Sequence, residues 1–120
     1  MTNPPLKKDY DLEERTAMFG AMVIKFCQQV PRGPVTDPLI TQLVKCGTSV
    51  GANYCEADDA ESKQDFKHKI GICKKEAREA KHFVKMIIVA VPTLQTTGIK
   101  VWQEAKELNL IFNTIYRKVK

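Results

Sequence analysis

Residues 62–92 read SKQDFKHKIGICKKEAREAKHFVKMIIVAVP, and the spacing of the apolar residues in this stretch predicts one long helix. The apolar positions recur at alternating steps of four and three residues, which is the 3.5-residue period that left-handed helix bundles bury. Ser62 followed by Asp65 is typical of a helix N-terminus, and Pro92 prevents the helix from continuing. The buried seam is expected to consist of Phe66, Ile70, Cys73, Ala77, Ala80, Val84, Ile87 and Val91.

Three other segments show helical spacing of apolar residues, and strand-like alternation is nearly absent. Asp11 with Glu14 suggests a capped start for the first helix. Asp37 before Pro38 suggests an N-cap followed by proline at the first helical position of the second. The sequence predicts four helices, at about residues 11–30, 38–59, 62–91 and 99–118.

The turns between these segments are short, and the one after Pro92 is expected to contain threonines and Gly98. Short turns favour antiparallel neighbours. We therefore expect an all-α fold with one domain over residues 1–120, a left-handed, antiparallel, up-down-up-down four-helix bundle. Gly47 and Gly51 interrupt the second helix, and each costs up to about 1 kcal/mol relative to alanine. Close packing against a neighbouring helix would offset that cost.

The composition limits the class of protein. The chain has 120 residues, of which 43% are hydrophobic and 28% charged, which suits one domain and excludes most multi-domain enzymes. The longest apolar run has six residues, Met86 to Val91, so no membrane span is expected. The start, Met1–Lys8, lacks the hydrophobic segment of a secretion signal, and we expect a cytoplasmic protein. A formal charge of +5 makes anionic partners plausible.

The four cysteines show no spacing typical of a metal site or of a redox pair, since no two are separated by only two residues. Most of them fall on apolar helix faces, where reduced cysteine commonly packs as a small hydrophobic residue. We therefore expect neither zinc binding nor disulfides from Cys27, Cys46, Cys55 and Cys73.

One flank of the 62–91 helix is strongly basic. Beside the seam, the same four-three stepping gives the basic row, which consists of Lys63, Lys67, Gly71, Lys74, Arg78, Lys81 and Lys85. Like charges at this spacing repel one another, so the row is mildly unfavourable without a counter-charge. Solvation or pairing with acidic side chains would explain it, and so would the phosphates of a nucleic acid. The residues predicted to contact nucleic acid are Arg32, Lys67, Lys74, Lys75, Arg78, Lys81 and Lys85.

The opposite flank of this helix includes three apolar residues outside the seam. Either the core is wide enough to include them, or they line a subunit interface together with aromatic residues of the last helix. The residues predicted for such an interface are Ile72, Phe83, Met86, Trp102 and Tyr116.

Catalytic patterns are weak. Asp65 with His68 and Glu79 with His82 have the spacing of di-iron bundle ligands, but both pairs lie on one helix, whereas that chemistry needs two helices. Both histidines are expected to point outward. Residues 47–51 lack the lysine and hydroxyl pair of a phosphate-binding loop. No catalytic residue, metal or cofactor is predicted, and we expect the protein not to be an enzyme.

Several stretches resemble one known family of four-helix bundles, the 23S rRNA-intervening sequence proteins, which also includes the Avd accessory proteins of diversity-generating retroelements. The most specific part is the pair Gly47 and Gly51 followed by Asn53, Tyr54 and Glu56, because these residues recur together in that family. The resemblance spans residues 10–118, and the matching stretches are Tyr10–Thr16, Pro38–Val44, Gly47–Ala57 and Phe66–Ala77.

The resemblance implies a bacterial, non-enzymatic, four-helix protomer that assembles into a ring-shaped homopentamer with a positively charged surface. Members are encoded within ribosomal-RNA insertions or beside a retroelement reverse transcriptase, and the Avd branch is associated with RNA and with that polymerase. Our leading hypothesis is an oligomeric RNA-binding or RNA-associated scaffold. The alternative is an assembly subunit whose basic row docks an acidic protein partner, such as a reverse transcriptase, without binding RNA directly.

Overall fold

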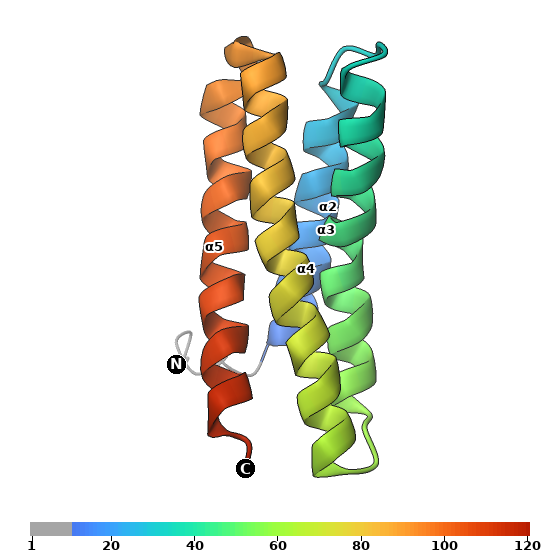
Figure 1. Cartoon of the computed structure of the whole chain (residues 1–120), viewed down its shortest axis with the longest axis vertical. Coiled ribbons are helices and arrows are strands. Elements are labelled where there is room, and N and C mark those ends of the chain that lie inside the picture. The colour runs from blue at the N-terminus through green and yellow to red at the C-terminus, as the bar shows by residue number, and fades with distance from the viewer. Residues whose placement is uncertain (1–10) are drawn as a thin grey trace, which may run out of the picture.

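The computed structural model describes residues 11–120 of the chain, and the prediction made from Met1–Lys8 lies outside them. Four long α-helices and one 3-10 turn account for most of this part, and it contains no strand. They are α2 (Leu12–Gln28), α3 (Thr36–Asp58), α4 (Lys63–Ala90), η1 (Pro92–Leu94) and α5 (Gln95–Lys118). Successive helices run in opposite directions (Figure 1), which confirms an all-α, up-down-up-down four-helix bundle.

The helix starts follow the sequence in two places and depart from it in two. The Ser62 hydroxyl accepts a hydrogen bond from the Asp65 backbone N–H at 3.0 Å, so the predicted cap of α4 is confirmed. Asp11 directly precedes α2 as predicted, but the predicted cap is wrong, because the Asp11 side chain makes no capping hydrogen bond. The prediction that Asp37 caps a helix starting at residue 38 is wrong, because α3 begins at Thr36. The Asp37 carboxylate instead accepts hydrogen bonds from Arg32 and from the Gly33 backbone.

The predicted start of the last helix is also wrong, since α5 begins at Gln95 and not near residue 99. Pro92 ends α4 but begins the 3-10 turn, which leads directly into α5. Gly98 therefore lies inside the helix and not in a turn. A Cβ atom on Gly98 would lie 2.7 Å from Cδ1 of Ile88, so glycine lets α5 start close to the end of α4.

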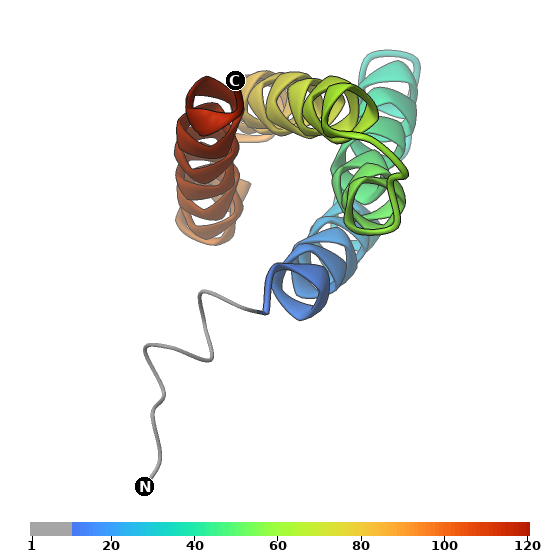
Figure 2. The same cartoon turned by 90° about the horizontal axis from the view of Figure 1, so that it is seen from below.

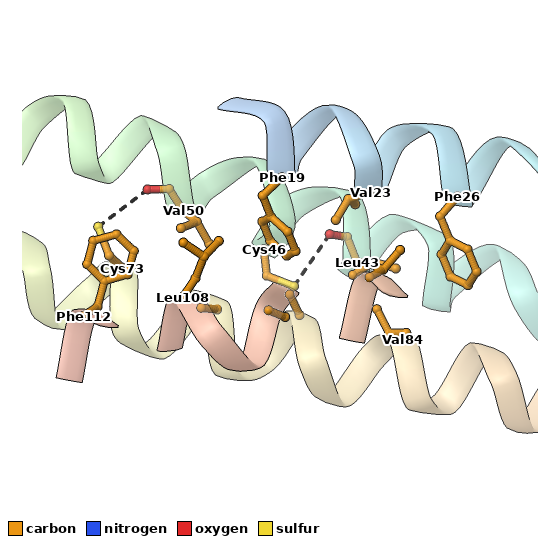
Figure 3. Packing of buried hydrophobic residues seen from close by; sticks show 14 of the residues in the cluster. Phe19, Val23, Phe26, Leu43, Cys46, Val50, Cys73, Val84, Leu108 and Phe112 are labelled. Atoms are coloured by element: carbon orange, nitrogen blue, oxygen red, sulfur yellow. Dashed lines mark hydrogen bonds between the residues drawn. The ribbon is translucent and has the colours of Figure 1, made fainter. Parts of the chain in front are cut away.

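The core contains the predicted seam. Six of its residues, from Ile70 to Ile87, have no exposed surface, while Phe66 and Val91 lie at its edges. Figure 3 shows the packing of aromatic and aliphatic side chains from all four helices, including Phe19 and Phe26 of α2 and Phe112 of α5. Interlocking side chains of this kind supply most of the stabilisation of a helix bundle.

Small residues let α2 and α3 approach each other closely, as expected from the glycines in α3. A Cβ atom on Gly47 would lie 2.8 Å and 2.9 Å from the two methyl carbons of Val23, which is closer than packing permits. Gly51 lies against the backbone of Thr16, and Gly20 lies opposite Thr48. The helix propensity lost at these glycines is therefore offset by packing between the two helices.

The bundle is less tightly closed on its fourth side. Viewed along the helices, α4 lies between α3 and α5, and the ribbons of α2 and α5 lie farther apart than those of successive helices (Figure 2). A shallow groove runs between α2 and α5, and its lining includes Met18 and Met22. The Arg15 guanidinium crosses it and donates hydrogen bonds to Glu104 at 2.8 Å and 3.0 Å and to Glu107 at 2.8 Å. These bonds, chiefly those to Glu104, raise the pKa of Arg15.

Candidate nucleic-acid interface

The basic row follows the flank of α4 that faces α5. The ammonium nitrogens of Lys67 and Lys74 lie 4.8 Å and 4.5 Å from the centre of the Tyr116 ring. The Lys81 ammonium lies 5.6 Å from the centre of the Trp102 ring. Distances below about 6 Å are typical of cation–π interactions. The row therefore forms one side of a strip whose other side is α5.

The row consists of two kinds of cation. Lys67, Lys74 and Lys81 are seven residues apart, so they repeat on the same face of α4, and all three are half-buried beside α5. Lys63, Arg78 and Lys85 are exposed. Gly71 interrupts the row where the Tyr116 ring passes, since a Cβ atom there would lie 3.1 Å from that ring.

The row is not neutralised by acidic side chains in the part of the chain that the structure describes. The ion pairs within residues 11–120 involve Arg15, Arg32 and Lys69, and none of them includes a member of the row. Lys69 pairs with Glu56 of α3 at 2.6 Å, on the other flank of α4. Intramolecular pairing, one of the explanations offered for the row, therefore does not apply between these residues.

The other two predicted contacts lie apart from the strip between α4 and α5. Arg32 is in the turn between α2 and α3, where its Nε donates to the Asp37 carboxylate at 2.6 Å. Lys75 is exposed on α4 and lines a shallow hollow with Gln42 of α3 and with Arg78 of the row. The structure thus places Lys67, Lys74 and Lys81 against α5, with Arg78 and Lys85 exposed along the same row. Lys75 meets the row only at Arg78, and Arg32 lies apart from it.

The five residues predicted for a subunit interface fall into two groups on opposite sides of α4. Trp102 and Tyr116 lie beside the basic row, whereas Phe83 lines the hollow that includes Gln42 of α3. Phe83, Trp102 and Tyr116 pack against the core. Of the three flank residues of α4, Phe83 therefore fits the wide-core explanation, while Ile72 and Met86 are half-buried. A single interface formed by all five would have to extend around α4.

Three residues of α5 that the sequence analysis did not single out complete the strip. The Lys106 ammonium lies 5.4 Å from the centre of the Trp102 ring. The Asn109 side-chain amide donates to the Lys74 backbone carbonyl at 2.8 Å, and the Asn113 carbonyl lies 3.5 Å from the Lys74 ammonium. Lys106 follows Trp102 by four residues, which is about one helical turn. This spacing is the feature of the sequence from which a cation beside the Trp102 ring could have been predicted.

Three of the four cysteines are buried, and one is exposed. Cys27, Cys46 and Cys73 are buried, and Cys55 is exposed. Burial raises the pKa of Cys27 to about 11 and is the main cause that raises the pKa of Cys46 and of Cys73 to about 12. Because the thiolate is the reactive form, the buried thiols are inert near neutral pH.

We expect a colorimetric thiol reagent at pH 8 to modify one thiol per native chain rapidly, and all four only after denaturation. Cys55→Ser should remove the rapid phase while leaving three thiols that react in denaturant. Rapid modification of two or more thiols in the native protein would contradict the burial of the others.

The two histidines do not form a catalytic group in the described chain. Both His68 and His82 are exposed, and the ring of His82 packs edge-on against Phe83 at 5.2 Å between ring centres. Between residues 11 and 120, no cluster of three or more histidine, cysteine, aspartate or glutamate side chains is arranged to hold a metal ion. No helix in this region has the length and hydropathy needed to cross a membrane.

Fold and site together define a class of protein, the four-helix bundles with a cationic strip between two adjacent helices. The model of the 23S rRNA-intervening sequence protein family matches residues 8–91, and the chain belongs to this family. The matched region includes the basic row on α4 and ends before α5.

A solved structure supports the fold independently. It is the crystal structure of a protein of unknown function from the S23 ribosomal protein family of Bacteroides thetaiotaomicron, with a TM-score of 0.77 and 23% sequence identity. The similarity covers 88% of this chain and 98% of that one. At this identity the likeness concerns the fold alone. No curated protein matches the sequence.

Proposed function

We propose that this protein is a non-enzymatic RNA-binding protein that holds phosphates through the basic row of α4. The observation that carries the proposal is the strip between α4 and α5, where the cations of the row lack a carboxylate partner within residues 11–120. A row of positive charges without carboxylate partners attracts a polyanion. Because the chain belongs to a family named for a ribosomal-RNA insertion, we take that polyanion to be RNA.

The proposal predicts strong salt dependence and weak sequence selectivity, because phosphate contacts release counterions and read no bases. With about five phosphate contacts, affinity should fall on the order of a hundredfold between 50 and 200 mM salt. Fluorescence anisotropy of a labelled RNA hairpin at several salt concentrations measures this slope. Affinity that does not change with salt would contradict the proposal.

The second candidate function is assembly, and the groove between α2 and α5 favours it. Met18 is 63% exposed, Met22 37% and Leu110 54%, so this side of the bundle presents apolar surface that a second copy of the chain could cover. The ring-shaped homopentamer implied by the family resemblance would bury such a surface. A protein partner such as a retroelement reverse transcriptase would use the basic row instead. A bacterial, cytoplasmic location and the link to Avd accessory proteins stay predictions.

Light scattering on a size-exclusion column tests the assembly. The wild-type protein should have five times the mass of one chain, and the pair Met18→Glu and Leu110→Glu should reduce the mass to that of a monomer, because buried carboxylates would oppose association. The pair Ile72→Glu and Met86→Glu tests, by the same measurement, two residues of the subunit interface predicted from the sequence. A wild-type monomer at micromolar concentration would contradict the assembly.

A further inference from the structure

One face of α5 repeats an aromatic and amide pattern opposite the basic row. The pattern advances by steps of four and three residues, so its members share one face of the helix. Its residues are Trp102, Lys106, Asn109, Asn113 and Tyr116, and the pattern includes no acidic residue. The nearby carboxylates of α5, Glu104 and Glu107, lie instead on the side of the helix that meets Arg15 of α2.

Each aromatic ring of this face lies next to two ammonium groups. Trp102 has Lys81 at 5.6 Å and Lys106 at 5.4 Å, measured from the ring centre to the ammonium nitrogen. Tyr116 has Lys67 at 4.8 Å and Lys74 at 4.5 Å. Both rings are only half-buried. The two positions are 14 residues apart, which corresponds to about 21 Å along the helix axis.

We propose that Trp102 and Tyr116 stack on unpaired bases, so that the preferred ligand is a single-stranded stretch of RNA lying along the strip between α4 and α5. This inference rests on the proposed function and names the class of RNA that the same site would take. Lys67, Lys74, Lys81 and Lys106 would contact the phosphates that flank the stacked bases.

The chemistry of the strip fits a single strand better than a duplex. Proteins that bind single-stranded nucleic acid combine a cationic groove with aromatic rings, because every base has a face that stacks on such a ring. In a duplex the bases already stack on one another, so they cannot cover a ring at the surface of a protein. Phosphates alone would require only the lysines, and the rings would then add nothing to binding.

The lysines that lie near the rings do not prevent stacking. A lysine ammonium at a partly exposed ring is held weakly and sits on a flexible four-carbon chain. It can therefore turn from the ring to a phosphate when a base approaches. The Lys74 backbone is less adaptable, since its carbonyl accepts the Asn109 amide at 2.8 Å and so ties the two helices together between the rings.

Trp102 is the only tryptophan in the chain, so its fluorescence reports directly on one of the two rings. The experiment titrates the full-length protein with an unstructured oligouridylate of about 12 nucleotides and with an RNA duplex of the same length. We expect saturable quenching by the single strand and at least several-fold tighter binding of the single strand than of the duplex.

Variants separate stacking from charge and from folding. Stacking on one ring is worth on the order of tenfold in affinity, so Trp102→Leu should weaken oligouridylate binding about tenfold in an anisotropy assay. Trp102→Phe should retain most of the affinity, since it keeps a ring. Tyr116→Leu and Tyr116→Phe form a second matched pair. Lys25→Gln, an exposed lysine on α2, is the control for a lost charge, and circular dichroism checks each fold.

The outcomes distinguish this inference from the proposed function. If both RNAs bind with strong salt dependence but equally well, and Trp102→Leu leaves affinity unchanged, the stacking inference is wrong while phosphate binding stands. If Trp102→Leu changes the mass of the assembly and not the affinity for RNA, the ring belongs to a subunit interface and the inference is also wrong. If neither RNA binds, both the proposed function and the inference fail.

Discussion

RNA affinity is expected to fall on the order of a hundredfold when the five cations of the strip on α4 are replaced together by glutamine. An exposed ion pair contributes on the order of half a kcal/mol, so five phosphate contacts sum to roughly 2.5 kcal/mol, which corresponds to a loss of this size. Glutamine keeps helix propensity, and the fold should therefore persist. Anisotropy with a labelled RNA hairpin measures the loss, and the salt dependence should nearly vanish with it. The variant combines Lys67→Gln, Lys74→Gln, Arg78→Gln, Lys81→Gln and Lys85→Gln.

A control variant removes the same number of charges elsewhere. Its five lysines are all exposed and lie outside α4, and both variants have a formal charge of zero because the wild type has +5. The control should lose only a few-fold in affinity. Equal losses in the two variants would mean that binding follows total charge and not the row, which contradicts the proposed site. The control combines Lys25→Gln, Lys45→Gln, Lys100→Gln, Lys118→Gln and Lys120→Gln.

The second large effect concerns stability. Gly47→Leu should lower the free energy of unfolding by about 3 kcal/mol or more, because the new side chain would enter the space of Val23. Val23 is fully buried and β-branched, so it has no room to turn away. For a domain of this size the thermal midpoint should drop by about 10 °C or more. Thermal unfolding followed by circular dichroism measures the change.

Gly20→Ala is the matched control for the role of space at this helix crossing. A Cβ atom on Gly20 would lie 3.7 Å from the nearest atom, Cα of Thr48, which is an ordinary contact. Alanine gains up to about 1 kcal/mol of helix propensity over glycine, so this variant should be more stable than the wild type. If both variants lost stability equally, the glycines would be needed for something other than close approach.

The core could be predicted from the sequence because one helix carries a nearly unbroken 3.5-residue period. The predicted helix 62–91 matches α4, Lys63–Ala90, and its seam is buried. The start of α5 was missed because Gly98, which the sequence suggests is part of a turn, serves close packing against Ile88. Local sequence does not distinguish a glycine that bends the chain from one that admits a neighbouring side chain.

The one-sided charge of α4 could be predicted as well, since it follows from helical spacing alone. The surroundings of that charge could not. Trp102 and Tyr116 were expected to accompany Phe83, yet they lie on the opposite flank of α4. Which face of α5 meets which flank of α4 depends on the rotation of each helix within the bundle. Packing of all four helices sets that rotation, and the period of one segment does not reveal it.

Because α5 is the last of the four helices along the chain, it also affects how the protein folds during translation. The ribosome releases α2, α3 and α4 first, and α5 supplies Val101, Leu108 and Phe112 to the common core. Until that helix emerges, Phe26, which packs near Gly98, and Tyr54, which packs on Phe112 at 5.9 Å between ring centres, lack their last neighbours. A nascent chain that stalls after α4 would thus expose the apolar surface that α5 normally covers, and chaperones or proteases would bind it.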